Sequence, residues 1–535
     1  GVITGEDVSK STKPFSVGVT APVRYYCAAT DRARFVGEPV AVVVARDRYL
    51  AEDAADAMVV RYEPLPAVVD PERALEPDAP VLHEAVGSNL AGHRRLVYGD
   101  PEGAFADADI VIRERFRFPK YASTPIETYG IIARWDPLDD VLTVWSNFMG
   151  PFIMHPLTAR VLGLPENKMR FIVPSDIGGS FGIKSSIYPY IALIALCAMK
   201  TGVPVKWIED RREHLLASSS GTDRVAYREV AARRDGTVLG MRYRWLDNVG
   251  GYIRSPEPGC SFRPTGNFVG PYRFQNLEVD ASVVMTNKSL TGPNRGYACG
   301  HLYFETESMM DLLAARVGLD PAEIRRRNLI PAGAFPYRTP SGGLYDSGDY
   351  PAAFDKALDI ARYEELRREQ RRARTEGRYV GIGLALAVDP SVSNMGYVAT
   401  GLDPQFRAKP EYLPKSGAVD SATVKVDPLG RVIVIMGTTP QGQGHQTVVS
   451  QIIADELGLT PGDVTVVDEM DTFTRVWSIS SGTYSSRFGS VGTSAAALAA
   501  RKLKTKLVEY AAHLMDVPVE TVEYREGAVR LRVGK

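Results

Sequence analysis

DIGGSFGIKSS, residues 176–186, places three glycines within five positions and then a lysine, directly ahead of the apolar run IYPYIALIALCAM at 187–199. Glycines allow positive φ and leave backbone N–H groups uncovered, and a helix that follows directs its positive dipole end at any anion. The stretch predicts a glycine-rich loop that a ligand approaches closely, followed by a buried helix. An ordinary tight turn into that helix is the competing interpretation.

A bound phosphate is the first candidate ligand. From Gly178 the stretch fits the phosphate-binding pattern G-x-x-x-x-G-K-[ST], except that Ile183 stands where the second glycine is required. A protein that binds a nucleoside triphosphate through Gly178 to Lys184 therefore stays open as an alternative.

Composition excludes several classes of protein. The chain has 535 residues, which predicts two to four domains, and its 63 basic and 64 acidic residues give a net charge of −1. That balance argues against nucleic acid or an anionic membrane as the main partner. Four scattered cysteines suggest neither a disulfide framework nor a cysteine-built metal site. The apolar run is too short to span a bilayer and no signal peptide is visible, so a cytoplasmic protein is expected.

The order of patterns predicts a mixed α/β and α+β protein. Residues 1–97 contain a strand–helix–strand pattern at 35–62 and then a proline-rich break. Residues 98–335 mix strands and helices, and 336–378 form a connector with one amphipathic basic helix. Residues 379–535 begin with a hairpin and continue to a long helix at about 493–515. Because residue 1 is glycine in a strand-like stretch, the N-terminus is expected to be incomplete.

Three further loops share the logic of the first. GTTPQGQGHQT, 437–447, combines bare backbone with amide side chains that donate and accept hydrogen bonds. SSGTYSSRFGSVGTSAAALAARKL, 480–503, puts hydroxyl groups and Arg487 before an alanine-rich helix, an arrangement typical of an oxyanion receptor. TGPNRGYACGHLYFETE, 291–307, carries Arg295 among turn residues. A plain turn in which His445 caps a helix, a serine-capped helix and a surface arginine are the competing interpretations.

These loops suggest one ligand rather than several. They contain no H-E-x-x-H pair. Anion-binding loops spread over two domains imply a large, multiply polar ligand that lies across an interface. The sequence therefore predicts a cofactor of dinucleotide size.

Taken together, the four segments resemble the molybdenum-binding large subunit of the xanthine dehydrogenase and aldehyde oxidase family, including members like aerobic carbon monoxide dehydrogenase. GGSFGIK resembles the family's G-G-G-F-G-x-K loop, PNRGYACG its F-R-G-F-G-G segment, QGQGH its cofactor loop and GTYSSRFGSVG its later serine-rich loop. The resemblance implies a hammerhead-type domain at 1–97 and two molybdopterin-binding domains at 98–335 and 379–535.

The resemblance also implies an activity and a set of partners. The expected reaction is oxidative hydroxylation of an aldehyde, an N-heteroaromatic ring or an acyl thioester with oxygen from water, carried out by a molybdopterin cofactor, usually in its cytosine dinucleotide form. Electrons would pass to [2Fe–2S] and FAD centres. The [2Fe–2S] centres are expected on a partner subunit, because this chain has no cysteine clusters to ligate them. The FAD would lie on another subunit, and the resemblance implies a dimer of heterotrimers. The cofactor-binding residues that the resemblance implies are Gly179, Ser180, Phe181, Gly182, Asn294, Arg295, Gly296, Gln441, Gly442, Gln443, Gly444, His445, Thr447, Ser485, Ser486, Arg487, Ser490, Val491 and Gly492.

Departures from the family pattern affect the substrate. Met149, in VWSNFMGPF, stands where the family commonly has a glutamine, and a thioether cannot donate a hydrogen bond. Ser185 replaces the glutamate of purine hydroxylases, and Gly296 replaces the cysteine of carbon monoxide dehydrogenase, with Cys299 too far along to take its place. Xanthine and carbon monoxide are therefore disfavoured. The family's base glutamate would lie beyond Lys535.

Three more residues have open roles. Tyr297 and His301 are candidates for the substrate pocket, although His301 could instead cap the helix that follows. Glu127, in STPIETYG, is expected to be a structural carboxylate paired with a nearby cation rather than a base. The remaining alternatives are a divergent member with a different redox reaction, the triphosphate-binding protein and a non-catalytic scaffold.

Overall fold

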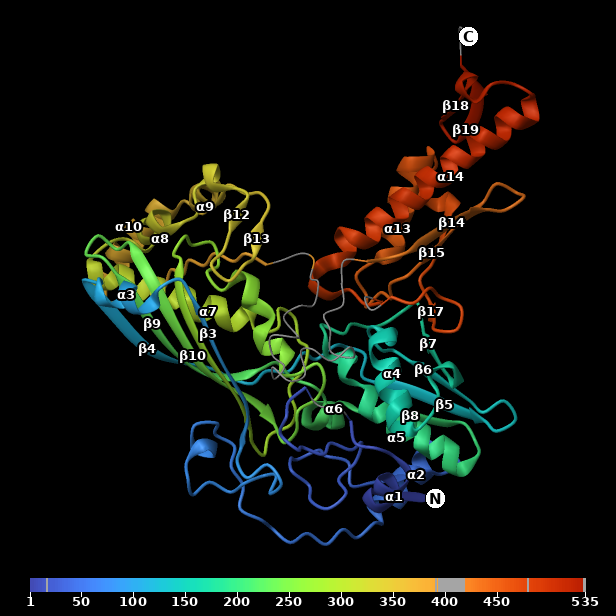
Figure 1. The fold of residues 1–535 in the computed structure, drawn as a ribbon, viewed down its shortest axis with the longest axis horizontal. Coiled ribbons are helices and arrows are strands. Elements are labelled where there is room, and N and C mark those ends of the chain that lie inside the picture. Colours follow the sequence, from blue (N-terminus) through green and yellow to red (C-terminus); the bar gives the residue numbers. More distant parts are fainter. Residues whose placement is uncertain (16–17, 390–391, 393–418, 479–480, 533–535) are drawn as a thin grey trace.

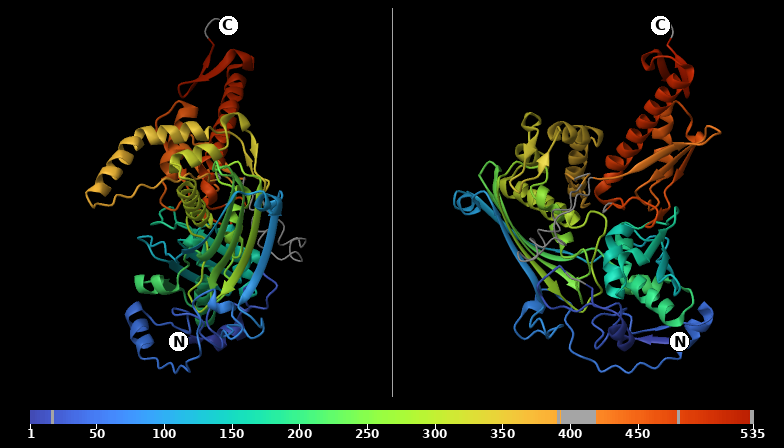
Figure 2. Two further views of the ribbon diagram at one scale, coloured as in Figure 1. Left: turned by 90° about the vertical axis from the view of Figure 1, so that its left-hand side faces the viewer. Right: turned by 45° about the vertical axis from the view of Figure 1, so that its right-hand side comes forward.

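The computed structural model describes residues 1–15, 18–389, 392, 419–478 and 481–532. The N-terminal segments lie along the base of the molecule, two sheets stand side by side above them, and a C-terminal α/β unit stands above the second sheet (Figure 1). Figure 2 shows the same arrangement from two further sides. The fold is mixed α/β, as the sequence predicts.

The N-terminal region forms a small α/β unit. β1 (Val2–Thr4) pairs antiparallel with β2 (Ala41–Val43), and the helices are α1 (Gly5–Ser11) and α2 (Arg48–Asp56). The second strand predicted near residues 58–62 is wrong, because this segment pairs with no strand in the described ranges, and Val59 is 85% exposed. Its β-branched composition suits a strand, but pairing requires a neighbouring edge.

The first large sheet has five strands in the order β3-β11-β10-β9-β4. Their bounds are Leu90–Tyr98 for β3, Ile110–Phe118 for β4, Asp223–Ala232 for β9, Val238–Gly250 for β10 and Asn276–Met285 for β11. Three helices accompany it: α3 (Pro101–Ala106), α7 (Cys299–Val317) and α8 (Pro321–Asn328). One core cluster joins Met241 and Trp245 of the sheet with Met309 and Leu313 of α7, so burial of apolar surface holds α7 on the sheet.

The second large sheet has the order β17-β7-β6-β5-β8. Its strands are β5 (Gly130–Asp136), β6 (Val141–Ser146), β7 (Met169–Val173), β8 (Val205–Ile208) and β17 (Met470–Asp471). The helices are α4 (Pro151–Leu162), α5 (Tyr188–Thr201) and α6 (Arg211–Ala217). α5 is buried from Tyr188 to Ala198, which confirms the predicted buried helix. Because β17 comes from the C-terminal region, this sheet joins two regions of the chain.

The connector differs from its prediction. After the short pair β12 (Tyr337–Arg338) and β13 (Leu344–Tyr345), the single expected helix is two helices, α9 (Tyr350–Ile360) and α10 (Tyr363–Thr375). Arg362 separates them with a left-handed φ of 49°, and a left-handed residue cannot continue a right-handed helix. α10 extends away from the rest of the protein (Figure 2, left).

The C-terminal unit packs two helices on a three-stranded sheet. β14 (Ala422–Val426) and β15 (Val432–Met436) form the predicted hairpin, and β16 (Val464–Val467) pairs with β15 in parallel. The helices are α13 (His445–Leu457) and α14 (Val491–Met515), and α14 lies close to the bounds predicted for the long helix. β18 (Val522–Arg525) and β19 (Ala528–Leu531) form the final hairpin. Within the described ranges, no helix combines the length and apolarity needed to cross a membrane.

Candidate functional site

The four loops singled out in the sequence meet at one place. A Cβ on Gly182 would lie 2.9 Å from the carbonyl oxygen of Pro293, and one on Gly442 would lie 3.1 Å from the carbonyl oxygen of Ile177. Gln443 Nε2 donates to Thr483 Oγ1 at 2.9 Å, which links the loop at 437–447 to the loop at 480–503. Loops from both halves of the chain therefore surround one site.

Backbone strain is concentrated in these loops. Of the eight non-glycine residues with left-handed φ that the structure describes, four lie in them: Phe181, Tyr297, Ser485 and Ser486. Each costs free energy that the surrounding structure must offset, and such residues cluster at ligand sites. The conformations point to a binding function for the loops.

The loop at 176–186 is fastened at both ends to Glu127. Gly178 N–H donates to Glu127 Oε2 at 2.9 Å, and Lys184 Nζ donates to the same oxygen. The Lys184 side chain is fully buried, and its pKa is lowered by burial, a shift that Glu127 opposes. Glu127 is thus a structural carboxylate paired with a cation, as predicted.

This ion pair contradicts the phosphate-binding alternative. A phosphate-binding lysine must extend its ammonium group to the ligand, whereas the ammonium of Lys184 is held by Glu127 beneath the loop. Lys184 also lies in a short 3₁₀ segment, Ile183–Ser186, before α5 begins. Phe181, in contrast, is 46% exposed at the tip of the loop.

The loop at 291–297 packs against the first. The guanidinium of Arg295 lies over the Phe181 ring, 5.3 Å from its centroid. Asn294 Oδ1 accepts from Ser123 Oγ and from the backbone N–H of Arg295, and its Nδ2 is buried without a partner among the described residues. Gly296 has a φ of 86°, so the backbone here takes a path that favours glycine.

Gln441 is the clearest candidate for a ligand-binding side chain. It is 6% exposed, and neither atom of its amide has a hydrogen-bond partner within the part of the chain that the structure describes. An unsatisfied buried amide costs free energy, which a polar ligand would recover. Its backbone N–H donates to Gln443 Oε1, which fixes the loop.

His445 has a packing role rather than a capping one. It begins α13, whose N-cap is Gly444 with no side-chain cap, so the capping alternative is wrong. The ring stacks on Phe488 with 3.6 Å between centroids, and burial lowers its pKa to about 4. The neutral imidazole joins the loop at 437–447 to the loop at 480–503, while Gly442, Gly444 and Thr447 are exposed beside it.

Arg487 has an ionic partner within the protein. Its guanidinium is 1% exposed and pairs with Asp420 at 3.2 Å, so the protein already balances the charge that was expected in an anion receptor. Ser485 Oγ instead accepts from Arg263 Nη2 at 2.7 Å. Ser490 precedes α14 and Val491 and Gly492 begin it.

Met149 lies against the loops at 176–186 and 480–503. Ser180 Oγ lies 3.8 Å from Met149 Sδ, in hydrogen-bonding geometry for an O–H donor. A Cβ on Gly150 would lie 1.6 Å from the hydroxyl of Tyr484, so this tyrosine crosses the backbone beside Met149. Sequence reasoning missed Tyr484 because nothing marked it among the serines of its loop, and it missed Ser123, Arg263 and Asp420 because they lie outside every motif.

The candidates for a substrate pocket have defined partners. Ser185 Oγ donates to the Gly182 carbonyl at 2.7 Å. His301 is fully buried against the Phe118 ring, with Nε2 at 2.9 Å from the Thr222 carbonyl oxygen, and burial lowers its pKa to about 4. α7 has Ala298 as its N-cap, so the alternative that His301 caps this helix is wrong.

Comparisons with known proteins give the family. Family models match residues 82–329 and 356–535 as molybdopterin cofactor-binding domains, and residues 1–66 as the aldehyde oxidase and xanthine dehydrogenase a/b hammerhead domain. The carbon monoxide dehydrogenase large chain of Afipia carboxidovorans is 36% identical over 530 residues, which cover 94% of this chain and 63% of the relative. The nicotine 6-hydroxylase large subunit of Paenarthrobacter nicotinovorans is 32% identical over 98% of this chain and 65% of its own.

Solved structures agree. Quinoline 2-oxidoreductase from Pseudomonas putida 86 superposes with a TM-score of 0.88 and 29% identity, over 99% of this chain and 66% of that one. The Cu,Mo-CO dehydrogenase gives a TM-score of 0.85 and 33% identity, over 100% of this chain and 68% of that one. The chain spans a little under two thirds of the length of the two curated relatives. With its hammerhead and two molybdopterin-binding domains, the chain belongs to the aldehyde oxidase and xanthine dehydrogenase family of molybdenum oxidoreductases.

Proposed function

We propose that this chain binds the cytosine dinucleotide form of molybdopterin and supplies the active site of an enzyme that hydroxylates a carbon of its substrate with oxygen from water. The substrate classes are an N-heteroaromatic ring, an aldehyde or an acyl thioester. The names of two similar proteins, nicotine 6-hydroxylase and quinoline 2-oxidoreductase, favour the heteroaromatic ring among them.

The unsatisfied amide of Gln441 carries the cofactor assignment. Its N–H groups and carbonyl oxygen lie buried where the loops at 176–186 and 437–447 meet, and a pterin or a dinucleotide offers acceptors and donors to both. Asn294 Nδ2 adds a second buried donor without a partner among the described residues. The side chains present therefore fit a large polar cofactor.

The residues of the chain would bind and orient. When bound, the cofactor supplies the redox chemistry of the hydroxylation. The left-handed backbone at Gly179 and Gly182 would shape the loop around it, and Phe181, under the guanidinium of Arg295, would shield the site from water. Met149 offers a thioether in place of an amide donor, so a divergent member with another redox reaction is the alternative within the family.

Carbon monoxide oxidation is the less favoured reaction. Gly296 stands where the resemblance expects a cysteine, and Cys299 begins α7, buried. Burial raises the pKa of the Cys299 thiol to about 11, which disfavours the thiolate that a metal would need.

Partners complete the proposed enzyme. We expect an iron–sulfur subunit and an FAD-binding subunit, in a dimer of heterotrimers in the cytoplasm, with the base glutamate beyond Lys535. Two relatives have names that describe them as the large chain or large subunit of an enzyme.

Elemental analysis of the purified complex, with identification of the released pterin nucleotide, tests the proposal. We expect about one molybdenum per chain and a cytosine nucleotide. Gln441→Leu should lose most of both. The unfolding midpoint of the cofactor-free protein should not fall in the variant, because the Gln441 amide holds no other part of the described chain. Gln451→Leu, at an exposed position of α13, is the matched control. A complex without molybdenum or pterin, from a host that makes the cofactor, would refute the proposal.

A further inference from the structure

A cavity lies between the N-terminal unit and the start of α5. Its lining comes from three segments: residues 25–39, the first turn of α5 at Pro189 and Tyr190, and Arg254. The cavity has a volume of about 10 Å³, which is enough for one water-sized species. α5 follows the 3₁₀ segment that ends the loop at 176–186, so the cavity lies at the base of that loop.

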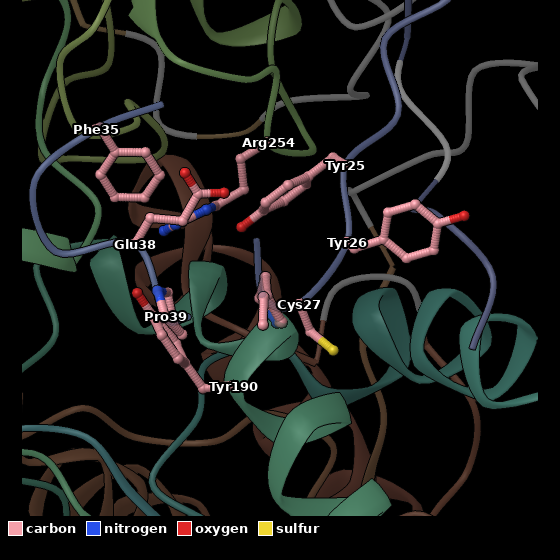
Figure 3. A pocket seen from close by; sticks show the side chains of 10 residues that line it. Tyr25, Tyr26, Cys27, Phe35, Glu38, Pro39, Tyr190 and Arg254 are labelled. Atoms are coloured by element: carbon pink, nitrogen blue, oxygen red, sulfur yellow. The ribbon is translucent and has the colours of Figure 1, made fainter. Parts of the chain in front are cut away.

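Arg254 is the unusual member of the lining. Its side chain is fully buried, with the residue 1% exposed, and its Nε and Nη1 have no hydrogen-bond partner among the described residues. A guanidinium is always charged in proteins. Its neighbours include Tyr25 and Tyr190, whose ring centroid lies 6.0 Å from Arg254 Cζ, but no carboxylate forms an ion pair with it among the described residues. A buried cation without an anionic partner is unfavourable. Figure 3 shows the guanidinium facing the cavity, with the Glu38 carboxyl group and the Tyr25 hydroxyl directed toward it.

The nearest candidate for a counter-charge has another role. Glu38 Oε2 accepts the backbone N–H of Arg34 at 2.6 Å. Burial raises the pKa of Glu38 to about 7, so at or below neutral pH much of this carboxyl group is uncharged. The first turn of α5 adds the positive end of a helix dipole on the other side of the cavity.

We propose that this cavity is a binding site for one small monovalent anion, such as chloride, held by Arg254. The anion balances the guanidinium and joins the N-terminal unit to the base of the loop at 176–186. The site is independent of the proposed reaction, because no residue of the cofactor set lines it. Larger anions are excluded by the size of the cavity.

The Glu38 carboxylate and the anion should compete for the charge of Arg254, so a proton bound to Glu38 should favour anion binding. The titratable groups around the cavity are Glu38, Cys27, Arg254, Tyr25, Tyr26 and Tyr190, with Arg34 and Tyr252 against Glu38. Burial raises the pKa of Cys27 to about 12 and raises the pKa values of Tyr25 and Tyr190. Glu38 is thus the group that gains negative charge as pH rises through neutrality, and that charge repels the anion.

Bromide provides the direct test. Crystals of the purified complex grown with bromide in place of chloride should show one anomalous difference peak beside Arg254 Nε and Nη1. An ordered water at that position, with no anomalous signal, would overturn the proposal.

Solution measurements separate binding from crystal conditions. Replacing gluconate with chloride at constant ionic strength should raise the unfolding midpoint of the wild-type protein and of the exposed control Arg46→Gln, but not of Arg254→Gln.

The apparent chloride affinity should weaken at least about tenfold from pH 6 to pH 8.5, which equals one pKa unit of coupling. Glu38→Gln should abolish the pH dependence of the chloride affinity. This second variant tests the proposal even if Arg254→Gln does not fold. A midpoint that chloride does not change, even with a bromide peak in crystals, would overturn the site as a feature of the protein in solution.

Discussion

Gly150 shows how tightly single residues define the site. It has a φ of 75°, and a Cβ added there would lie 1.6 Å from the Tyr484 hydroxyl. Gly163 has a similar φ of 70°, but a Cβ added to it would have no atom within 4 Å. Substitution of the two glycines therefore separates the cost of a left-handed φ from the cost of a steric clash.

Gly150→Ala should destabilise the protein by about 2 kcal/mol more than Gly163→Ala, because only the first variant displaces Tyr484. It should also reduce the cofactor content, since Tyr484 belongs to one of the cofactor loops. Denaturant unfolding and molybdenum analysis measure the two effects. Adding Tyr484→Phe should recover part of the loss, and equal costs for the two glycine variants would refute the steric argument.

Glu257 gives a prediction about pH. It is buried, and burial, with a contribution from the charge of Asp247, raises its pKa to about 8. The folded state thus keeps a proton that the unfolded chain loses near its ordinary pKa. The stabilisation is complete at low pH and decreases as pH rises from about 4.5 to about 8, by roughly 1.4 kcal/mol per pH unit.

Glu257→Gln should remove this contribution. The free energy of unfolding of the variant, measured in denaturant from pH 5 to pH 8, should rise relative to the wild type as pH increases. The comparison uses the difference between the two proteins, so other titrating groups cancel. A constant difference across that range would show that Glu257 does not titrate there.

Among the elements, the break between α9 and α10 results from the backbone conformation of a single residue. Arg362 is exposed and holds a left-handed φ of 49°, which costs an L-residue about 1 kcal/mol that glycine avoids. Arg362→Gly should therefore stabilise the protein slightly. Arg368→Gly, at an exposed position inside α10, should destabilise it by about 1 kcal/mol. Thermal unfolding of both variants provides the check, and destabilisation by both would refute the strain at Arg362.

Elements with a strong local signal could be predicted from the sequence, and those that depend on neighbours could not. The apolar run of α5 and the Pro-Leu-Gly turn between β14 and β15 specify their structures locally. The strand expected near 58–62 has the right residues but no partner edge, and the left-handed Arg362 carries no mark in sequence. The motifs also brought the four cofactor loops to attention, but their contacts with Glu127, Asp420 and Tyr484 depend on the fold.

At the scale of the whole molecule, a two-residue strand docks the C-terminal unit. β17 pairs with β7, and Asp471 accepts two hydrogen bonds from Arg170, at 3.1 Å and 2.6 Å. Bidentate pairs of this kind are among the stronger charged contacts. Because the Asp471 side chain is only 13% exposed, solvent screens the contact weakly.

Asp471→Asn should loosen this docking, with faster hydrogen exchange in β7 and β17 and a lower cofactor content. Asn can still accept from Phe473 N–H, so the turn should survive. Asp427→Asn is the matched control, because Asp427 also caps a turn but pairs with Arg431 inside its own hairpin. Equal exchange rates in β7 for the two variants would contradict a docking role for Asp471.

The arrangement of the cofactor loops also sets an order of events during biosynthesis. The loops at 176–186 and 291–297 leave the ribosome well before the loops at 437–447 and 480–503, and domains fold from the N-terminus as they emerge. Until the last loops arrive, the nascent chain has only half of the binding surface. Insertion of the cofactor should therefore follow translation of the C-terminal unit, because a chain that stops before it would lack both β17 and the last two loops.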